Sequence, residues 1–322
     1  MRPATPLLVL TIGQGLAGGI IVCLAALMWM GRLTGPEAIV PVLAALGTAA
    51  VGGMGSFFHM HNLKAARYVM RRLKTSWLSR EALTTAIFGA LLAVLTAWTL
   101  FDGAGVSSVG YQTLLVVTAA TGVLAMWVTA MLYATIPAVL SWHTPLTVLN
   151  LMLVGITSGV AVTAGWVSAV PSLWIGFAIL LALTAAVKLL HWTHFLRAHG
   201  QIRAETGTGL PFSPYRLQDT GTTKPPYRTQ TQVWPLLQPA LLRTVKLWTV
   251  GWLFVIPLAA VVVWQTGAWG GARWVLPVGA MLGVIAERWL FFADATHSSR
   301  VFFVDEPRRA PQVPMTGARK SM

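Results

Sequence analysis

The sequence predicts an all-α fold: a polytopic membrane protein built as a bundle of eight transmembrane helices. Hydrophobic residues make up 56% of the 322 residues and charged residues only 10%, whereas a soluble domain carries about 25% charged residues. The apolar residues gather in eight runs, each close to the roughly 20 residues that a helix needs to cross the hydrocarbon core. No run alternates apolar and polar residues as a barrel strand does. These observations favour helical spans over a soluble fold.

The eight expected spans belong to one integral membrane domain and follow the apolar runs in chain order. The connector at residues 193–243 is rich in Pro, Gly and Thr, so we expect a surface arm there. Residues 294–322 are expected to form a polar tail. The spans are expected at residues 5–30, 38–59, 81–101, 113–138, 145–168, 173–192, 244–265 and 273–293.

The first two spans carry several glycines, and the first also carries an amide. Glycines such as Gly15 and Gly19, four residues apart, let helix backbones approach closely in lipid, so packing of span one against span two explains them. Gln14 is different, because a lone amide in an apolar helix needs a hydrogen-bond partner. We expect that partner to be another helix or a ligand.

A strongly basic connector joins the second and third spans. It contains six Lys or Arg residues and no acid before Glu81. Helical spacing would place most of its cations on one face and Leu63, Met70 and Leu73 on the other, which is typical of an amphipathic helix at a membrane surface. Such a face suits an acidic partner protein, and attraction to anionic lipid headgroups is the alternative. The cations expected to dock a partner are Lys64, Arg67, Arg71, Arg72 and Lys74.

Two titratable residues flank this connector. His59 ends the second span, and Glu81 begins the third. Titratable groups at a membrane edge tend to be functional. A structural role is the alternative for both: His59 would cap the second span, while Ser79 would be the N-cap of the third and Glu81 would favour its dipole from the first turn.

The positive charges lie almost entirely on one side of the predicted membrane. Alternate connectors, together with both termini, carry 18 Lys or Arg residues, whereas the opposite connectors carry Arg32 alone. Positive residues stay on the cytoplasmic side of a bacterial inner membrane. We therefore expect both termini, the basic connector and the arm to be cytoplasmic.

The polar residues inside the spans gather in the third of the membrane nearest that basic side. A transporter is expected to carry polar groups and broken helices near the midplane instead, and a proton pump a relay of acids across it. A polar pocket on one side suits a lipid-soluble redox carrier such as a quinone. The residues concerned are Gln14, His59, Glu81, Tyr133, Glu287 and Arg288.

Several other classes are disfavoured by the sequence. The single cysteine, Cys23, excludes an intrachain disulfide and a cysteine-ligated cluster. The seven histidines lie at or beyond the expected cytoplasmic span ends, so we expect no haem and no metal site. No nucleotide or nucleophile motif is present, and TGTG at 206–209 lacks the GxGxxG spacing. The net charge of +14 follows from the membrane topology, so we expect no nucleic-acid partner.

Four segments resemble the membrane anchor subunit of the dimethyl sulfoxide reductase family. The second of them contains the Phe-His and Ser-x-Leu-Ser-x-Glu elements typical of the family, with Met60 and His61 in place of its Leu-Gly. The resemblance implies an eight-helix anchor without haem that binds menaquinone or ubiquinone, with His59 and Glu81 at the quinone site. The segments are TIGQGLAGGIIV, SFFHMHNLKAARYVMRRLKTSWLSREAL, MLYATIPAVLSWHTPLTVLN and AERWLFF.

The resemblance also implies the partners of the chain. Anchors of this family exchange electrons with an iron–sulfur subunit, which serves a molybdopterin catalytic subunit. The segment TGTGLPFSPYRLQD is similar to a branch that anchors a cytoplasm-facing sulfite dehydrogenase. An anchor for a reductase that oxidises menaquinol, and more remotely a transporter, are the alternatives. In the quinone site, Gln14, Tyr133 and Arg288 are expected to add hydrogen bonds or balance charge.

Overall fold

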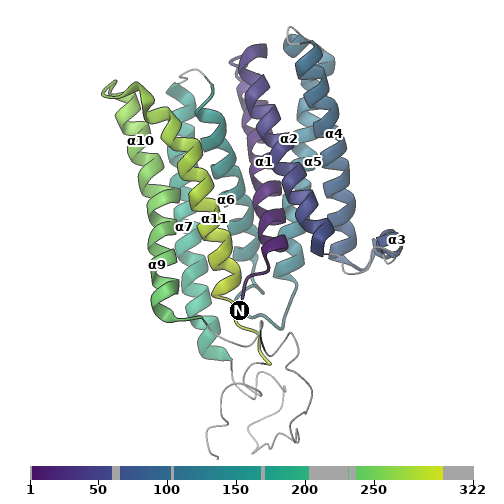
Figure 1. Cartoon of the computed structure of the whole chain (residues 1–322), viewed down its shortest axis with the longest axis vertical. Helices are drawn as coiled ribbons and strands as arrows, with labels where there is room; N and C mark the ends of the chain where they lie inside the picture. Colours follow the sequence, from purple (N-terminus) through teal and green to yellow (C-terminus); the bar gives the residue numbers. More distant parts are fainter. Residues whose placement is uncertain are drawn as a thin grey trace, which may run out of the picture.

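The computed structural model describes residues 2–59, 66–102, 105–167, 171–202, 231 and 237–299, and within these ranges it is helical with no strand. Eight helices in this part of the chain are long and apolar enough to cross a membrane. The all-α fold and the eight helices predicted from the sequence are confirmed (Figure 1).

The first four long helices form one half of the molecule. In this half α1 packs against α2 and α5, and α4 packs against α2 and α5. Short helical turns lie between them: α3 at Ala66–Val69, η2 at Met70–Arg72 and η3 at Gly105–Ser107. The long helices are α1 (Thr5–Trp29), α2 (Gly35–His59), α4 (Trp77–Phe101) and α5 (Val109–Ala134).

The remaining helices form the second half. One crossing is built from α9, a π-helical turn (η5) and α10 in succession, with Pro257 just after the π turn. Proline has no N–H to donate to the carbonyl four residues earlier, which accounts for the local change of helix type. The elements are α6 (Pro145–Ala164), α7 (Pro171–Gln201), α9 (Pro239–Val250), η5 (Gly251–Val255), α10 (Ile256–Gln265), η6 (Gly270–Trp274) and α11 (Val275–Ala293).

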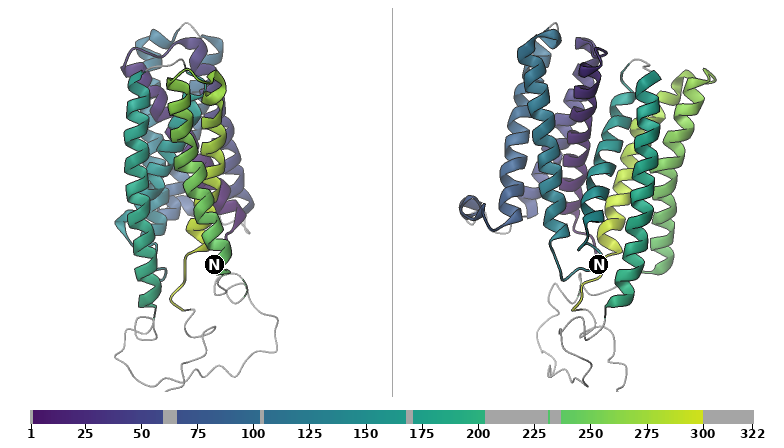
Figure 2. Two further views of the ribbon diagram at one scale, coloured as in Figure 1. Left: turned by 90° about the vertical axis from the view of Figure 1, so that its left-hand side faces the viewer. Right: turned by 180° about the vertical axis from the view of Figure 1, so that it is seen from behind.

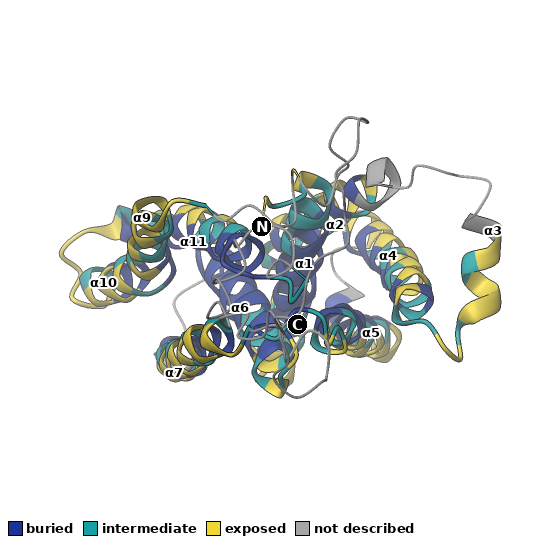
Figure 3. Ribbon diagram, turned by 90° about the horizontal axis from the view of Figure 1, so that it is seen from below, coloured by how far each residue is buried: buried dark blue, intermediate teal, exposed yellow. Residues whose placement is uncertain are grey.

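Helix α1 joins the two halves at the centre of the molecule (Figure 3). It contacts α2 and α5 on one side and α6 and α11 on the other. Close approach depends on glycine: a Cβ at Gly13 would lie 2.2 Å from the carbonyl oxygen of Thr48 on α2, and a Cβ at Gly159 on α6 would lie 2.3 Å from the backbone of Gly19. The glycines of span one therefore serve α6 as well as α2.

The end of the bundle that carries the N-terminus is here called the basic end (Figures 1 and 2). It comprises the start of α1, α3 with η2, the turn at 135–144, the end of α7, the start of α9 and residues 294–299. Helix α3 projects sideways from the bundle at this level (Figure 1). Among the described residues, Arg32 and Arg273 lie at the opposite end.

The third crossing begins earlier than the sequence predicted. Helix α4 starts at Trp77, and its N-cap is Ser76, whose hydroxyl accepts a hydrogen bond from the backbone N–H of Ser79 at 3.3 Å. The prediction of Ser79 as the N-cap was therefore wrong. Glu81 lies in the second turn and does not cap the helix.

Other boundaries also differ from the expected spans. Helix α5 ends at Ala134, short of the expected residue 138, while α7 continues to Gln201 and α9 begins at Pro239, so both ends of the expected arm are helical. In the described part of the basic connector, the helix runs only from Ala66 to Arg72, shorter than the expected amphipathic helix. Most of the arm (203–230 and 232–236), the tail from 300 and Lys64 lie outside the described residues.

Candidate functional site

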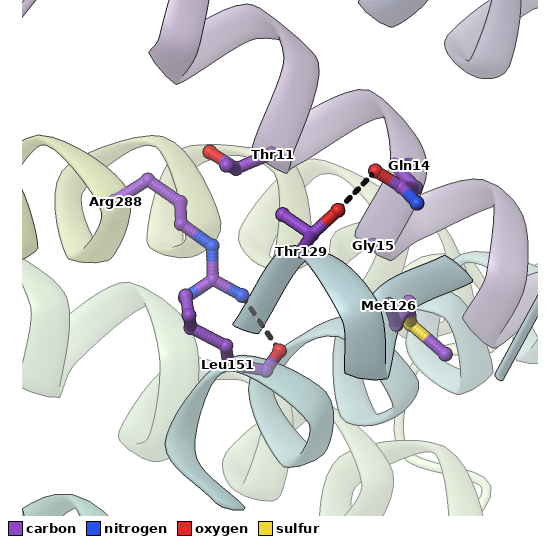
Figure 4. A pocket seen from close by; sticks show the side chains of 7 residues that line it. All are labelled: Thr11, Gln14, Gly15, Met126, Thr129, Leu151 and Arg288. Carbon is purple, nitrogen blue, oxygen red and sulfur yellow. Dashed lines mark hydrogen bonds between the residues drawn. The ribbon is translucent and has the colours of Figure 1, made fainter. Parts of the chain in front are cut away.

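A small polar pocket lies where α1, α5, α6 and α11 meet (Figure 4). Each lining residue comes from the half of its helix nearest the basic end. The space open to water, about 10 Å³, is near the minimum that holds one water molecule. The lining residues are Thr11, Gln14, Gly15, Met126, Thr129, Leu151 and Arg288.

Thr129 brings Gln14 and Glu81 together. Its hydroxyl oxygen lies 2.7 Å from Oε1 of Glu81 on α4 and 3.0 Å from Oε1 of Gln14 on α1. All three side chains are at most 6% exposed, and the amide nitrogen of Gln14 has no partner in the structure. The expectation that Gln14 finds a partner on another helix is confirmed, and that partner is Thr129.

Arg288 approaches the same pocket from α11 as part of a buried ion cluster. Its guanidinium donates to Oε2 of Glu287 at 2.5 Å and to the carbonyl oxygen of Leu151 at 2.8 Å, while its Nε has no partner. Glu287 also pairs with Lys188 of α7, and Asn150 donates to Oε1 of Glu287 at 2.9 Å. These contacts hold the guanidinium between α11 and α6.

The ion cluster continues toward the basic end through His191. On α7 the ring nitrogen Nε2 of His191 lies 3.1 Å from the hydroxyl of Thr147, and Nδ1 has no partner. The sequence placed this histidine at the end of its span, but α7 continues past it and His191 is only 1% exposed. The polar side chains of the second half thus run from the first turn of α6 to the pocket.

Tyr133 lies at the centre of an aromatic cluster between the pocket and the basic end. Its ring contacts Trp142, Phe291 and Phe292 edge to face, with centroids 5.4 to 5.5 Å apart. The indole N–H of Trp142 donates to the carbonyl oxygen of Phe291 at 3.1 Å. The charges of Glu81 and Arg288 both act on the hydroxyl of Tyr133, so this residue lies near both of them.

The structure brings together four of the five residues expected at the quinone site: Gln14, Glu81, Tyr133 and Arg288. The fifth, His59, is the last residue of α2, and its side chain lies outside the described part of the structure. Within the expected docking set, the side chains of Arg71, Arg72 and Lys74 are exposed. The side chains of Lys64 and Arg67 are not among those described.

Five further polar residues at the site were not among the residues expected to bind the quinone, although Glu287 was expected among the polar residues nearest the basic side. Threonine is common in apolar helices and usually bonds to its own helix, so nothing marked Thr129 in the sequence. Lys188 and Glu287 offered a usable signal, because two opposite charges inside apolar spans tend to pair. The full set is Thr129, Asn150, Lys188, His191 and Glu287.

The donors at the pocket fit the carbonyl oxygens of a quinone. Arg288 has an unused N–H, and Gln14 has an unpartnered amide group, so both can bind a ligand oxygen. The pocket itself has room for about one water molecule. A quinone ring therefore reaches these donors only if a lining side chain moves, and Met126, unbranched and adaptable, is the lining residue best suited to do so.

Two comparisons with known proteins place the chain in a family. Residues 1–204 match the model of the DMSO reductase anchor subunit (DmsC). The chain is also 28% identical over 332 aligned positions to a sulfite dehydrogenase subunit from Allochromatium vinosum, covering 94% of this chain and 99% of that one. No solved structure matches. The chain therefore belongs to the DMSO reductase anchor subunit family, whose members anchor oxidoreductase complexes in the membrane.

Proposed function

We propose that this protein exchanges electrons between the quinone pool and an iron–sulfur subunit docked at its basic end. The observation that carries the proposal is the convergence of Gln14, Glu81 and Arg288 around one pocket near that end. Buried polar and ionisable side chains are expensive inside a membrane and commonly mark a functional site. All the lining residues come from the halves of their helices nearest that end, and we propose that protons reach the pocket from there.

Each residue has a distinct role in this proposal. Quinone supplies the redox chemistry, taking up two electrons and two protons on reduction. Arg288 and Gln14 bind its oxygens, and Glu81 holds or releases a proton beside them. His59, at the end of α2, is expected to hydrogen-bond a quinone oxygen and exchange protons with water, because a histidine titrates near neutral pH.

The relative from a sulfite dehydrogenase supports sulfite as the substrate of the complex. We propose that the partner catalytic subunit is a molybdopterin enzyme that oxidises sulfite in the cytoplasm and passes electrons through the iron–sulfur subunit to this anchor. The charge bias supports a bacterial inner membrane location with the basic end in the cytoplasm. We propose ubiquinone or menaquinone as the lipid-soluble carrier.

The exposed cations of the basic connector are proposed to dock the iron–sulfur subunit. Arg71, Arg72 and Lys74 are exposed on a segment that projects from the bundle. Replacing Arg67, Arg71 and Lys74 by Glu is expected to release the soluble subunits from membranes, because reversed charges repel an acidic partner. Full retention of those subunits on the membrane would show that the connector does not dock them.

The proposal is tested on the purified complex. We expect an iron–sulfur protein and a molybdopterin protein to copurify with the chain, and we expect sulfite to reduce a short-chain quinone. His59→Ala should leave the complex assembled and its sulfite oxidation with an artificial acceptor intact, while quinone-linked turnover is lost. Normal quinone-linked turnover in that variant would exclude His59 from the site.

A second candidate is the opposite direction of electron flow. The family model that matches is named for a DMSO reductase anchor, so the complex could oxidise menaquinol and reduce dimethyl sulfoxide. Quinol-dependent reduction of dimethyl sulfoxide by the purified complex, without sulfite-dependent quinone reduction, would favour this candidate.

A further inference from the structure

The hydroxyl of Thr129 sits between two acceptor oxygens but carries a single hydrogen. It lies 2.7 Å from Oε1 of Glu81 and 3.0 Å from Oε1 of Gln14, and it can donate to only one of them. Therefore either Glu81 carries a proton that it donates to Thr129, or the amide of Gln14 is turned so that its NH₂ faces Thr129. Because the two ends of an amide are interchangeable by a half rotation, and a carboxyl can carry a proton, two arrangements satisfy every contact.

In the first arrangement Glu81 is protonated. Its O–H donates to the oxygen of Thr129, and Thr129 donates to the carbonyl oxygen of Gln14. The NH₂ of Gln14 is then the end without a protein partner, as the structure records. The pocket, which Arg288 also lines, then gains an N–H donor at Gln14.

In the second arrangement Glu81 is ionised. A carboxylate only accepts, so Thr129 donates to Glu81 and its oxygen is left to accept from Gln14. The amide of Gln14 must turn so that its NH₂ faces Thr129, and its carbonyl oxygen becomes the free end. The pocket then offers one acceptor at Gln14 and one donor at Arg288.

We propose that Thr129 is a positioning residue that transmits the protonation state of Glu81 to the amide of Gln14, and so sets which ligand oxygen the pocket matches. With Glu81 protonated, the free NH₂ of Gln14 matches a carbonyl oxygen, as in a quinone. With Glu81 ionised, the free carbonyl of Gln14 matches a hydroxyl, as in a quinol. This inference rests on the proposed quinone function and concerns the same pocket.

The groups around Glu81 are consistent with a change of its charge. Tyr133 of α5 is a titratable group on which the charges of Glu81 and of Arg288 on α11 both act. Lys188 and Glu287 pair with each other behind Arg288. On α2 the titratable residue is His59, whose side chain lies outside the described part of the structure. A mismatched buried donor or acceptor costs about 1–3 kcal/mol, enough to discriminate two ligand oxidation states.

The experiment compares the affinity of the complex for one short-chain ubiquinone held oxidised and for the same molecule held reduced, between pH 5 and pH 9. In the wild-type complex, the ratio of quinone to quinol affinity should fall by about tenfold or more as pH rises, because ionised Glu81 favours the hydroxyl. If both forms bind and the ratio stays constant, the coupling is overturned while the proposed function stands. If neither form binds, the proposed function itself is overturned.

Variants of Thr129 isolate the coupling. Thr129→Val keeps the shape but removes the hydroxyl, so the affinity ratio should become independent of pH to within about twofold, and Thr129→Ser should restore the dependence. Thr118→Val is the matched control, because Thr118 is buried on the same helix and donates only to Leu114 of its own helix at 2.7 Å. A pH-dependent ratio in Thr129→Val would overturn the proposal. If that variant does not assemble, Gln14→Met removes the amide at the other end of the hydrogen-bonded series Glu81–Thr129–Gln14. The affinity ratio should then also become independent of pH.

Discussion

Arg288 belongs to a group of three buried charges that do not cancel. Lys188, Glu287 and Arg288 are each at most 2% exposed, and two of them are cations. An uncompensated charge away from water costs several kcal/mol. Two acids outside the cluster act near it: the charge of Asp294 acts on Lys188, and the charge of Glu81 acts together with that of Arg288 on Tyr133. The ion cluster thus gives the pocket a positive bias that an ionised Glu81 offsets.

This charge count predicts an order of stability. Glu287→Gln leaves two buried cations without their shared anion and should lower the free energy of unfolding by about 3–5 kcal/mol. Lys188→Met leaves the neutral pair Glu287–Arg288 and should cost clearly less. Thermal unfolding of the detergent-purified complex measures the order of stability. The control is Thr184→Val on α7, one turn before Lys188, because it removes an uncharged hydrogen bond to Thr157 of α6 at 2.7 Å. A larger loss in Lys188→Met than in Glu287→Gln would show that the cluster carries no excess positive charge.

At single residues the sequence predicted the members of the site better than their contacts. Gln14, Glu81 and Arg288 stood out because each is a polar group in an apolar span, a property visible in the sequence. That Thr129 connects two of them depends on how α1, α4 and α5 pack, which no local pattern records. Capping was the structural alternative for Glu81 because the sequence predicted Ser79 as the N-cap, whereas the helix begins earlier and its N-cap is Ser76.

At the level of helices, α1 and α6 approach each other with backbone against backbone. A Cβ at Gly159 would lie 2.3 Å from the backbone of Gly19, and backbone cannot move aside cheaply. Gly159→Ala should therefore lower the free energy of unfolding by about 1–3 kcal/mol or more, through overpacking. Gly176→Ala on α7 is the control, because a Cβ there meets nothing within 4 Å. Equal thermal stability of the two variants would contradict this packing.

The segment after α11 is held at the basic end by contacts that depend on pH. His297 accepts from the backbone N–H of Ser299 at 3.1 Å through Nδ1, Ser298 donates to the carbonyl of Ala138 at 2.8 Å, and Asp294 pairs with Lys246 at 2.9 Å. Partial burial lowers the pKa of His297 below its usual value of 6.5. The unfolded segment therefore binds the proton more tightly, so the stabilisation is complete above about pH 6.5 and is lost as pH falls through the lowered pKa.

Hydrogen exchange tests this pH dependence. Protection of the Ser298 amide should fall between pH 7 and pH 5 beyond the intrinsic pH effect on exchange, because protonated Nδ1 no longer accepts. His297→Asn should show no such fall. Protection that stays constant across this range in the wild-type protein would contradict the assignment.

Hydropathy predicted the number and order of the crossings, because each crossing needs its own apolar run. It did not predict their ends. Helix α7 continues to Gln201 through a polar stretch, and α9 begins at Pro239, since helices can extend beyond the membrane where polar side chains face water. The pairing of α1 with α6 was also missed, because glycines do not indicate which neighbour they face.

For the whole molecule, the distribution of charge predicts its orientation. One set of connectors and both termini carry 18 Lys or Arg residues against one on the other set. Both termini should therefore be cytoplasmic. A reporter active only outside the cytoplasm, fused after Met322, should be inactive, and the same reporter inserted after Arg32 should be active. The reverse pattern would contradict the topology.

The central claim is that the pocket beside Glu81 is where the complex meets quinone. The most direct measurement is the binding and turnover of a short-chain quinone by the purified complex carrying Glu81→Gln, which keeps the shape of the side chain and the contact with Thr129 but cannot ionise. We predict an assembled complex with normal activity toward an artificial acceptor and quinone-linked turnover reduced at least about 100-fold, as for the loss of a general acid or base. Wild-type quinone-linked turnover in Glu81→Gln would contradict the account.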